Sequence, residues 1–191
     1  DIAGFTTLSE QLNSDELVKF ISEFFQEMSA IIIENSGTVD KYIGDCIMAF
    51  WNAPKTIENH EELAAKTALD CLTRLKELQK NWEARGLPFI DIRVGIHSDT
   101  VTVGNMGSKE RLNYTVIGDG VNLTSRLEGL GKVYGVPFIL SESVAKKLPD
   151  SFHLRPLDSV VVKGKTAPVP IFTATHEQCD EISSLHEKAY A

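Results

Sequence analysis

Two short apolar runs flank the dipeptide Gly44-Asp45 in the first third of the chain. Residues 38–43 and 46–51 are rich in β-prone side chains, and successive positions would face opposite sides of a strand. Glycine and aspartate between two such runs are typical of the tight turn of a β-hairpin. We therefore predict a hairpin with Asp45 at its tip. Turn chemistry alone explains this pattern, so the hairpin by itself implies no function.

Two longer segments carry apolar residues at helical spacing. The first is expected to begin at Ser14 as its cap and to run to Glu34, where residues 35–37 end it. The second is expected over residues 59–85. The inward positions are Leu17, Phe20, Ile21, Phe24, Met28, Ile31 and Ile32 in the first, and Ala64, Ala68, Leu72, Leu75 and Leu78 in the second. Such stripes indicate core packing, and for the first helix also dimer packing, rather than a cofactor site.

The remaining pattern alternates between strands and helices. Strands are expected over residues 89–98, 101–103, 114–117, 137–140, 152–158, 160–163 and 169–174, and helices from about residue 6, over 121–130 and over 142–147. Several connections are short enough for hairpins, including a turn at 99–100 between the first two of these strands. We therefore predict one α+β domain over residues 1–175, with a mixed, mostly antiparallel sheet and packed helices. Residues 176–191 are expected to form a polar tail.

Composition narrows the class of protein. A net charge of −8 in 191 residues argues against a nucleic-acid or anionic-membrane surface. Three cysteines without framework spacing favour reduced thiols and a cytoplasmic location. No apolar run approaches the length of a membrane span. Because the chain begins on a motif residue, we expect the natural protein to continue upstream, where a regulatory or membrane domain would lie.

Four short motifs occur in order along the chain. They are Asp1-Ile-Ala-Gly-Phe-Thr-Thr7, Lys41-x-x-Gly44-Asp45, Arg93-Val-Gly-Ile-His97-Ser98 and Tyr114-Thr-Val-Ile-Gly-Asp-Gly-Val-Asn122-x-x-x-Arg126. Together they resemble the catalytic domain of the class III adenylate and guanylate cyclases, over residues 1–174. The resemblance implies a ferredoxin-like fold related to the polymerase palm, a homodimer with shared sites, and a cyclic nucleotide as product.

Asp1 and Asp45 are the carboxylates at strand ends that could hold metal ions. Cyclisation of a nucleoside triphosphate needs negative charge neutralised and the ribose 3′-hydroxyl deprotonated, and two divalent cations between two carboxylates do both. Ligands that are all oxygen favour Mg²⁺ or Mn²⁺ over zinc. The resemblance adds the backbone carbonyl of Ile2 as a ligand.

Phosphate contacts are expected at the start of the first helix. Backbone amides of Gly4, Phe5 and Thr6 at a helix N-terminus can hold phosphate oxygens. The alternative is that a threonine there only caps the helix. The resemblance also assigns phosphate contacts to Arg93 and to Lys163, with Lys165 as the alternative to Lys163.

Asn122 and Arg126 lie four residues apart and hence on one face of the expected helix. Taken alone they could be a surface polar pair. The resemblance implies that Asn122 orients the ribose and that Arg126 meets transition-state charge on the α-phosphate. His97 matches a family position but receives no catalytic role. Asp99 stands where the family usually has glycine, and aspartate tolerates the positive φ that glycine would supply.

Lys41 and Thr115 are the expected purine contacts. Lysine can only donate, which suits the N1 acceptor of adenine, and the threonine hydroxyl can accept from the 6-amino group. In a guanylate cyclase of this kind, glutamate would replace Lys41 and usually cysteine would replace Thr115. ATP is therefore the expected substrate. Threonine at this position also implies likeness to the soluble-type, bicarbonate-responsive subgroup.

Three functions remain distinct at this point. The first is an active homodimeric adenylate cyclase. The second is a silent dimerisation or nucleotide-sensing module, which is disfavoured because Asp1, Asp45, Lys41, Asn122 and Arg126 are all present. The third is another two-metal nucleotidyl transferase such as a cyclic-dinucleotide synthase, whose Gly-Gly-Asp/Glu-Glu-Phe signature the sequence lacks.

Overall fold

The structure is a computed structural model that describes residues 1–161 and 167–176. The chain order of the elements is α1 (Phe5–Ser9), α2 (Ser14–Glu34), β1 (Thr38–Ile43), β2 (Cys46–Phe50), α3 (His60–Ala84), β3 (Val94–Ile96), β4 (Thr102–Gly107), β5 (Leu112–Ile117), α4 (Asp119–Tyr134), β6 (Phe138–Ser141), α5 (Glu142–Ala145), β7 (Phe152–Val160) and β8 (Val169–His176). These elements confirm the α+β class predicted from the alternation of patterns.

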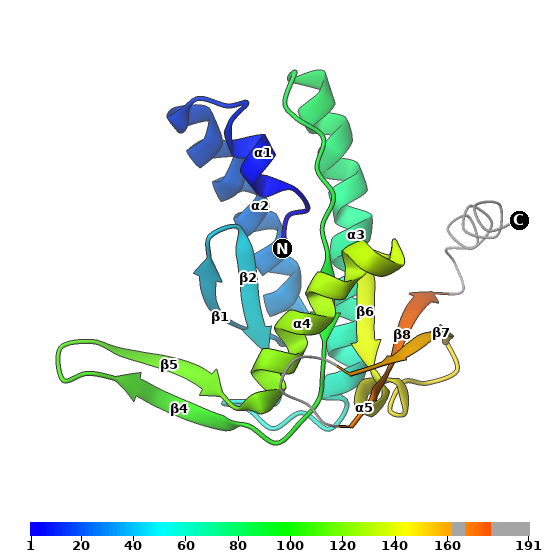
Figure 1. The fold of residues 1–191 in the computed structure, drawn as a ribbon. Coiled ribbons are helices and arrows are strands. Elements are labelled where there is room, and N and C mark those ends of the chain that lie inside the picture. Colours follow the sequence, from blue (N-terminus) through cyan, green and yellow to red (C-terminus); the bar gives the residue numbers. More distant parts are fainter. Residues whose placement is uncertain (162–166, 177–191) are drawn as a thin grey trace, which may run out of the picture.

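A four-stranded sheet in the order β3-β6-β8-β7 lies between two helices, with α4 in front and α3 behind in Figure 1. β3 and β6 are parallel, and the other neighbours are antiparallel. Alternate side chains of β6 point to opposite faces. Phe138 and Leu140 pack with Ala65 and Ala68 of α3, whereas Ile139 packs with the buried leucines of α4. The sheet is thus buried on both faces, which fixes its register.

A second apolar layer lies between α2 and α3. Phe20 and Trp82 are 1% and 0% exposed, and their ring centroids are 4.6 Å apart. The same cluster includes Ile2, which forms an isolated antiparallel bridge with Ile92. This packing holds the first residues of the chain against the segment that precedes β3.

Two hairpins complete the fold (Figure 1). β1 and β2 are joined by Gly44-Asp45 as predicted, and Gly44 has a φ of 64°. Tyr42 of β1 stacks on Phe25 of α2 with centroids 4.2 Å apart, which seats this hairpin on the helix. The β4–β5 hairpin instead projects from the rest of the domain.

Several local predictions were wrong. The cap of α2 is Asn13 rather than Ser14, because Asn13 and Glu16 bond each other's backbone amides in a capping box. Residues 89–98 form only the short strand β3, and Phe89 is 70% exposed. The helix predicted over residues 121–130 runs from Asp119 to Tyr134.

Strand pairing also differs from the prediction. Residues 101–103 do not pair with the strand at 94–96. Instead β4 extends through the glycines at 104 and 107 and pairs with β5, while β3 pairs with β6. The strand predicted over residues 152–158 extends to Val160, with a register shift between Pro156 and Asp158 that accommodates the proline. The second half of the strand predicted over residues 160–163 lies outside the described residues.

Within the described ranges 1–161 and 167–176, no helix is both long enough and apolar enough to cross a membrane.

Candidate active site

Asp45 lies against the first residues of the chain. The Ile2 amide donates a hydrogen bond to Asp45 Oδ2 at 3.0 Å. Ile2 is 1% exposed and bridges Ile92, and the Ala3 amide donates to the Asp91 carbonyl at 2.8 Å. The Gly44-Asp45 turn therefore presents the Asp45 carboxylate to the backbone of residues 2–3, which strand pairing and burial hold in place.

The Asp1 carboxylate is paired with a cation. Arg93 Nη2 lies 2.9 Å from Asp1 Oδ1, and Arg93 Nε lies 2.6 Å from Glu128 Oε1 on α4. The three side chains are 21–26% exposed. One guanidinium thus links the start of the chain to α4. The sequence analysis did not single out Glu128, since it lies two residues beyond Arg126 and outside every motif.

The donor set near Asp45 fits a hard divalent cation. Asp1 and Asp45 offer carboxylate oxygens, and Arg93 shows that positive charge is accommodated beside Asp1. The Ile2 carbonyl stays a predicted ligand. Within the described residues, no group of three or more histidine, cysteine, aspartate or glutamate side chains could hold a metal. A bound ion would thus also need oxygens from a substrate, as Mg²⁺ does in phosphate-transfer sites.

Cys46 follows Asp45 and lies in the same environment. Burial raises the pKa of its thiol, and the carboxylates of Glu128 and Asp45 raise it further. A thiol with a raised pKa is a poorer nucleophile at neutral pH than an ordinary cysteine.

The predicted purine contacts, Lys41 of β1 and Thr115 of β5, meet between these two strands. Lys41 Nζ donates to Thr115 Oγ1 at 2.9 Å, so that β1 and β5 are joined by these two side chains. Asp40, which the sequence analysis did not single out, accepts from Thr115 Oγ1 at 2.5 Å and lies 3.3 Å from Lys41 Nζ. Its side chain is 0% exposed. No motif marked Asp40, since an aspartate beside a lysine is common on protein surfaces.

The first helix begins at Phe5, one residue before the predicted start. Its N-cap is Gly4, with a φ of 75° and no side-chain cap. Thr6 and Thr7 lie inside the helix, so the alternative of a threonine cap is wrong. The backbone of Gly4, Phe5 and Thr6 therefore forms the open end of a short helix next to Asp1 and Ile2.

Helix α4 carries Asn122 and Arg126. Asn122 is exposed, and Arg126 is half-buried. Arg126 Nη1 is buried and has no hydrogen-bond partner among the described residues. An unpaired buried donor is unfavourable unless a ligand meets it. Lys163 and Lys165 lie outside the described residues.

The hydrogen bonds and ion pairs of these residues form two separate groups in the described part of the chain. One joins Asp1, Ile2, Asp45 and Arg93. The other joins Lys41 to Thr115. The two groups have no residue in common.

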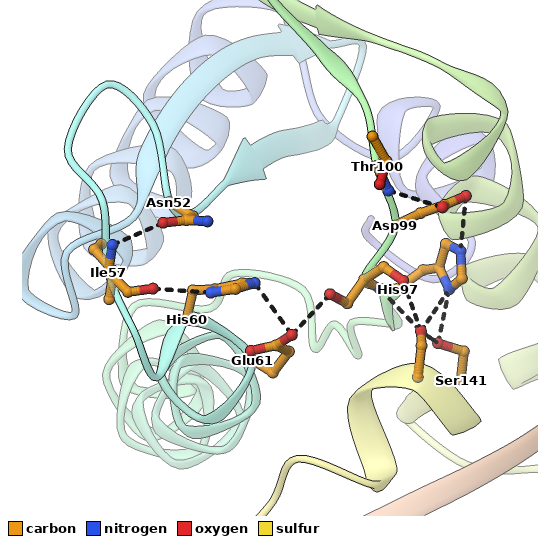
Figure 2. A network of polar contacts seen from close by, with 10 residues as sticks. Asn52, Ile57, His60, Glu61, His97, Asp99, Thr100 and Ser141 are labelled. Atoms are coloured by element: carbon orange, nitrogen blue, oxygen red, sulfur yellow. Dashed lines mark hydrogen bonds and ion pairs between the residues drawn. The ribbon is translucent and has the colours of Figure 1, made fainter.

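A polar network surrounds His97 (Figure 2). His97 Nδ1 lies 2.7 Å from Ser141 Oγ, and His97 Nε2 lies 3.6 Å from Asp99 Oδ2. Ser141 is 1% exposed and the His97 side chain 11%, so the arrangement orients the ring rather than offering a nucleophile. Asp99 does not need the positive φ that we expected, because only Ser36 and Asn52 among the described non-glycine residues have one. The network joins the segment after β3 to α5.

Comparisons with known proteins agree with this geometry. The profile of the family described as the adenylate and guanylate cyclase catalytic domain matches residues 1–176. Adenylate cyclase 1 of Rhizobium meliloti is 40% identical over 172 residues, which are 90% of this chain and 26% of that protein. The adenylate cyclase of Anabaena cylindrica is 40% identical over 176 residues, 90% of this chain and 35% of that protein. The chain thus spans about a quarter to a third of these relatives.

Solved structures give the same result. The adenylyl cyclase CyaB from P. aeruginosa superimposes with a TM-score of 0.86 at 34% identity, over 94% of this chain and 92% of that one. The guanylyl cyclase Cya2 superimposes with a TM-score of 0.85 at 31% identity, over 92% of this chain and 88% of that one. Since an adenylyl cyclase and a guanylyl cyclase superimpose on this chain nearly equally well, fold similarity does not choose between ATP and GTP.

Proposed function

The chain belongs to the adenylate and guanylate cyclase catalytic domain family, and on that premise we propose that it converts ATP to 3′,5′-cyclic AMP and pyrophosphate. The observation that carries the choice of ATP is the contact of Lys41 Nζ with Thr115 Oγ1 at 2.9 Å. The ammonium group donates to adenine N1, and the hydroxyl accepts from the 6-amino group. Guanine reverses both roles and would leave buried polar groups unpaired, at about 1–3 kcal/mol each.

Asp1 and Asp45, with the Ile2 carbonyl, are the groups that would hold two divalent cations, Mg²⁺ or Mn²⁺. Such ions neutralise phosphate charge and lower the pKa of the ribose 3′-hydroxyl. The hydrogen bond from the Ile2 amide to Asp45 Oδ2 supports this assignment, since it orients one oxygen of the carboxylate toward the chain start. It leaves Oδ1 available as a ligand.

The remaining roles fall to groups that bind and orient ATP. The buried, unpaired Nη1 of Arg126 supports its assignment to the α-phosphate, where negative charge grows as pyrophosphate leaves. Asn122, on the same face of α4, orients the ribose. The amides of Gly4, Phe5 and Thr6, together with Lys163, contact the phosphates.

Arg93 takes part in this scheme only by exchanging partners. Its guanidinium is bound to Asp1 and Glu128. Cations bound at Asp1 would compete with Arg93 for the carboxylate and free it to meet the terminal phosphates. Metal binding and phosphate binding by Arg93 are then linked events.

We assign the active form to a homodimer with two shared sites. One protomer supplies Asp1, Asp45 and Arg93, and its partner supplies the purine contacts and the face of α4. The projecting β4–β5 hairpin supports this, because it exposes apolar side chains that a partner would cover: Val103 is 37%, Leu112 62%, Tyr114 38% and Ile117 55% exposed. The reaction is assigned to the cytoplasm, where ATP is abundant, and the resemblance to bicarbonate-responsive cyclases makes bicarbonate a candidate activator.

The test is to incubate the protein with ATP and Mn²⁺ and to identify the product by mass. Cyclic AMP and pyrophosphate in equal amounts support the proposal, and Asp45→Ala serves as the inactive control. A nucleotide-binding protein without product would instead be a silent sensing module. A linked dinucleotide as product would identify a different two-metal transferase.

A further inference from the structure

Asp40 occupies an irregular position in β1. Val39 pairs with Ala49 and Lys41 pairs with Met48, so Asp40 is an extra residue in a β-bulge. In a regular strand, neighbouring side chains point to opposite faces, and Asp40 and Lys41 could not reach one partner together. Here both contact Thr115 on β5. The bulge has therefore turned the Asp40 carboxylate toward the purine contacts, as bulges beside active sites often do.

The hydrogen bonds of Thr115 fix the direction in which its hydroxyl can act. A threonine hydroxyl has one proton and two acceptor lone pairs. Its proton is donated to Asp40 Oδ2 at 2.5 Å, and one lone pair accepts from Lys41 Nζ at 2.9 Å. What remains for a ligand is a lone pair. Thr115, which is 6% exposed, can thus only accept from a bound base.

The carboxylate itself is held firmly. Asp40 Oδ2 also accepts from the Val116 amide at 3.3 Å, and the Lys41 ammonium 3.3 Å from Oδ1 offsets the charge of a side chain that is 0% exposed. Among the described residues, Oδ1 has no hydrogen-bond partner, so the ion pair with Lys41 is what compensates it. An ionised carboxylate has no proton to give, so Thr115 cannot reverse its hydrogen bond.

We propose that Asp40 is the residue that makes Thr115 selective, by turning an ambivalent hydroxyl into a pure acceptor. This inference rests on the proposed function of Lys41 and Thr115 as purine contacts. Asp40 acts through Thr115 and is a positioning residue that does not touch the base. With the proton of Thr115 committed, the 6-amino group of adenine finds an acceptor, whereas the 6-oxo group of guanine meets a lone pair. Without Asp40, the hydroxyl can rotate and donate, and the site loses its preference at position 6.

The test compares ATP with 6-methoxypurine riboside triphosphate, which keeps the N1 acceptor but carries an acceptor oxygen where ATP has the 6-amino donor. The ratio of kcat/KM for the two nucleotides therefore measures whether Thr115 accepts or donates at position 6. We expect ATP to be preferred about tenfold by the unmodified protein, and about twofold or less by Asp40→Ala. If that variant does not fold, Asp40→Ser keeps a polar group in the bulge without the carboxylate oxygen, and the same loss of preference is expected.

Thr115→Val supplies the matched control, because it removes the hydroxyl that Asp40 orients. Adding Asp40→Ala to Thr115→Val should leave the ratio unchanged. A purely structural role of Asp40 would lower kcat/KM for both nucleotides equally and keep the ratio, and that result would overturn the inference. Absence of cyclic product from every nucleotide with unmodified protein would instead reject the proposed function, so the two failures are distinguishable.

Discussion

Asp45 Oδ2 accepts a hydrogen bond from the Ile2 amide at 3.0 Å, although 43 positions separate the two residues in sequence. The bond holds the turn of the β1–β2 hairpin against the first residues of the chain. It uses one carboxylate oxygen and, within residues 1–161 and 167–176, leaves the other for a ligand, so it separates the structural part of Asp45 from the part that would bind metal.

Asp45→Asn tests that separation. The amide oxygen can still accept from Ile2, so the melting temperature should stay within about 2–3 °C of that of the unmodified protein. The metal ligand is lost, and kcat with saturating Mn²⁺ should fall by at least about 100-fold. Asp45→Ala should be as inactive. Asp150→Asn, a change at an exposed position, is the control, and near-normal turnover of either Asp45 variant would remove the assignment of Asp45 to metal.

The purine preference should respond to exchange of its two contacts. Lys41→Glu with Thr115→Cys should lower the turnover of ATP sharply and raise the ratio of GTP to ATP turnover. The structure adds a cost, because glutamate at 41 would lie beside the buried Asp40 carboxylate, now 3.3 Å from the Lys41 ammonium. The double variant should therefore be destabilised, and adding Asp40→Asn should restore part of the melting temperature. An unchanged ratio of GTP to ATP turnover would mean that these residues do not read the base.

Shared sites predict rescue between two inactive variants. Asp45→Ala and Arg126→Ala should each be nearly inactive alone. In a mixed dimer, one site collects both changes and the other has none. Random exchange makes half of the dimers mixed, so the mixture should recover about a quarter of normal activity. Heterodimers shown by differently tagged chains, without recovered activity, would reject the shared site.

The contact between β3 and α4 gives a prediction on stability. A Cβ on Gly95 would lie 2.5 Å from both the Glu128 amide nitrogen and the Thr124 carbonyl oxygen. Gly95→Ala should therefore push α4 away from the sheet, with a loss of about 1–3 kcal/mol in unfolding free energy and reduced activity through Arg126. Gly129→Ala, a change within α4 itself, is the matched control, since nothing lies within 4 Å of its added Cβ. That variant should be neutral or more stable by up to about 1 kcal/mol in thermal or urea unfolding.

Cys71 predicts a loss of stability at high pH. Burial raises the pKa of its thiol from 9.0 to about 12. Since the folded pKa is the higher one, stability is intact below pH about 9 and falls as the unfolded thiol ionises first. Cys71→Ala removes this effect. The stability difference between the unmodified protein and Cys71→Ala should shrink by about 2–3 kcal/mol between pH 8 and pH 11 in urea unfolding. A constant difference would contradict the raised pKa.

Local patterns predicted the long elements well. The helices at 14–34 and 60–84 and the hairpin at 38–50 appear where apolar periodicity and turn residues placed them. These signals are local, because a capping residue or a Gly-Asp turn acts on its own neighbours. The family predicted from four motifs is confirmed by the profile match over residues 1–176.

Long-range pairing was predicted less well. Residues 101–103 were expected to form a hairpin with the strand at 89–98. Instead β3 pairs with β6, and β4 pairs with β5. Which strands pair depends on burial between α3 and α4, and a short apolar run carries no record of its partner. The motifs contained the residues of both contact groups, around Asp45 and around Lys41. Asp40 and Glu128 were missed, because their contacts with Thr115 and Arg93 depend on the fold and not on a local sequence pattern. The catalytic roles stay predictions.

The β1–β2 hairpin carries Lys41 in one strand and Asp45 in its turn, four residues apart. In a dimer with shared sites, these two side chains serve opposite catalytic centres. One β-hairpin then contributes to both centres, so a shift of the hairpin when a base binds at one centre also moves the carboxylate at the other. Occupancy at the first centre should therefore alter turnover at the second. Initial rates should depart from a simple hyperbola in ATP concentration, with a Hill coefficient different from one, so that the dimer responds to its substrate as a unit.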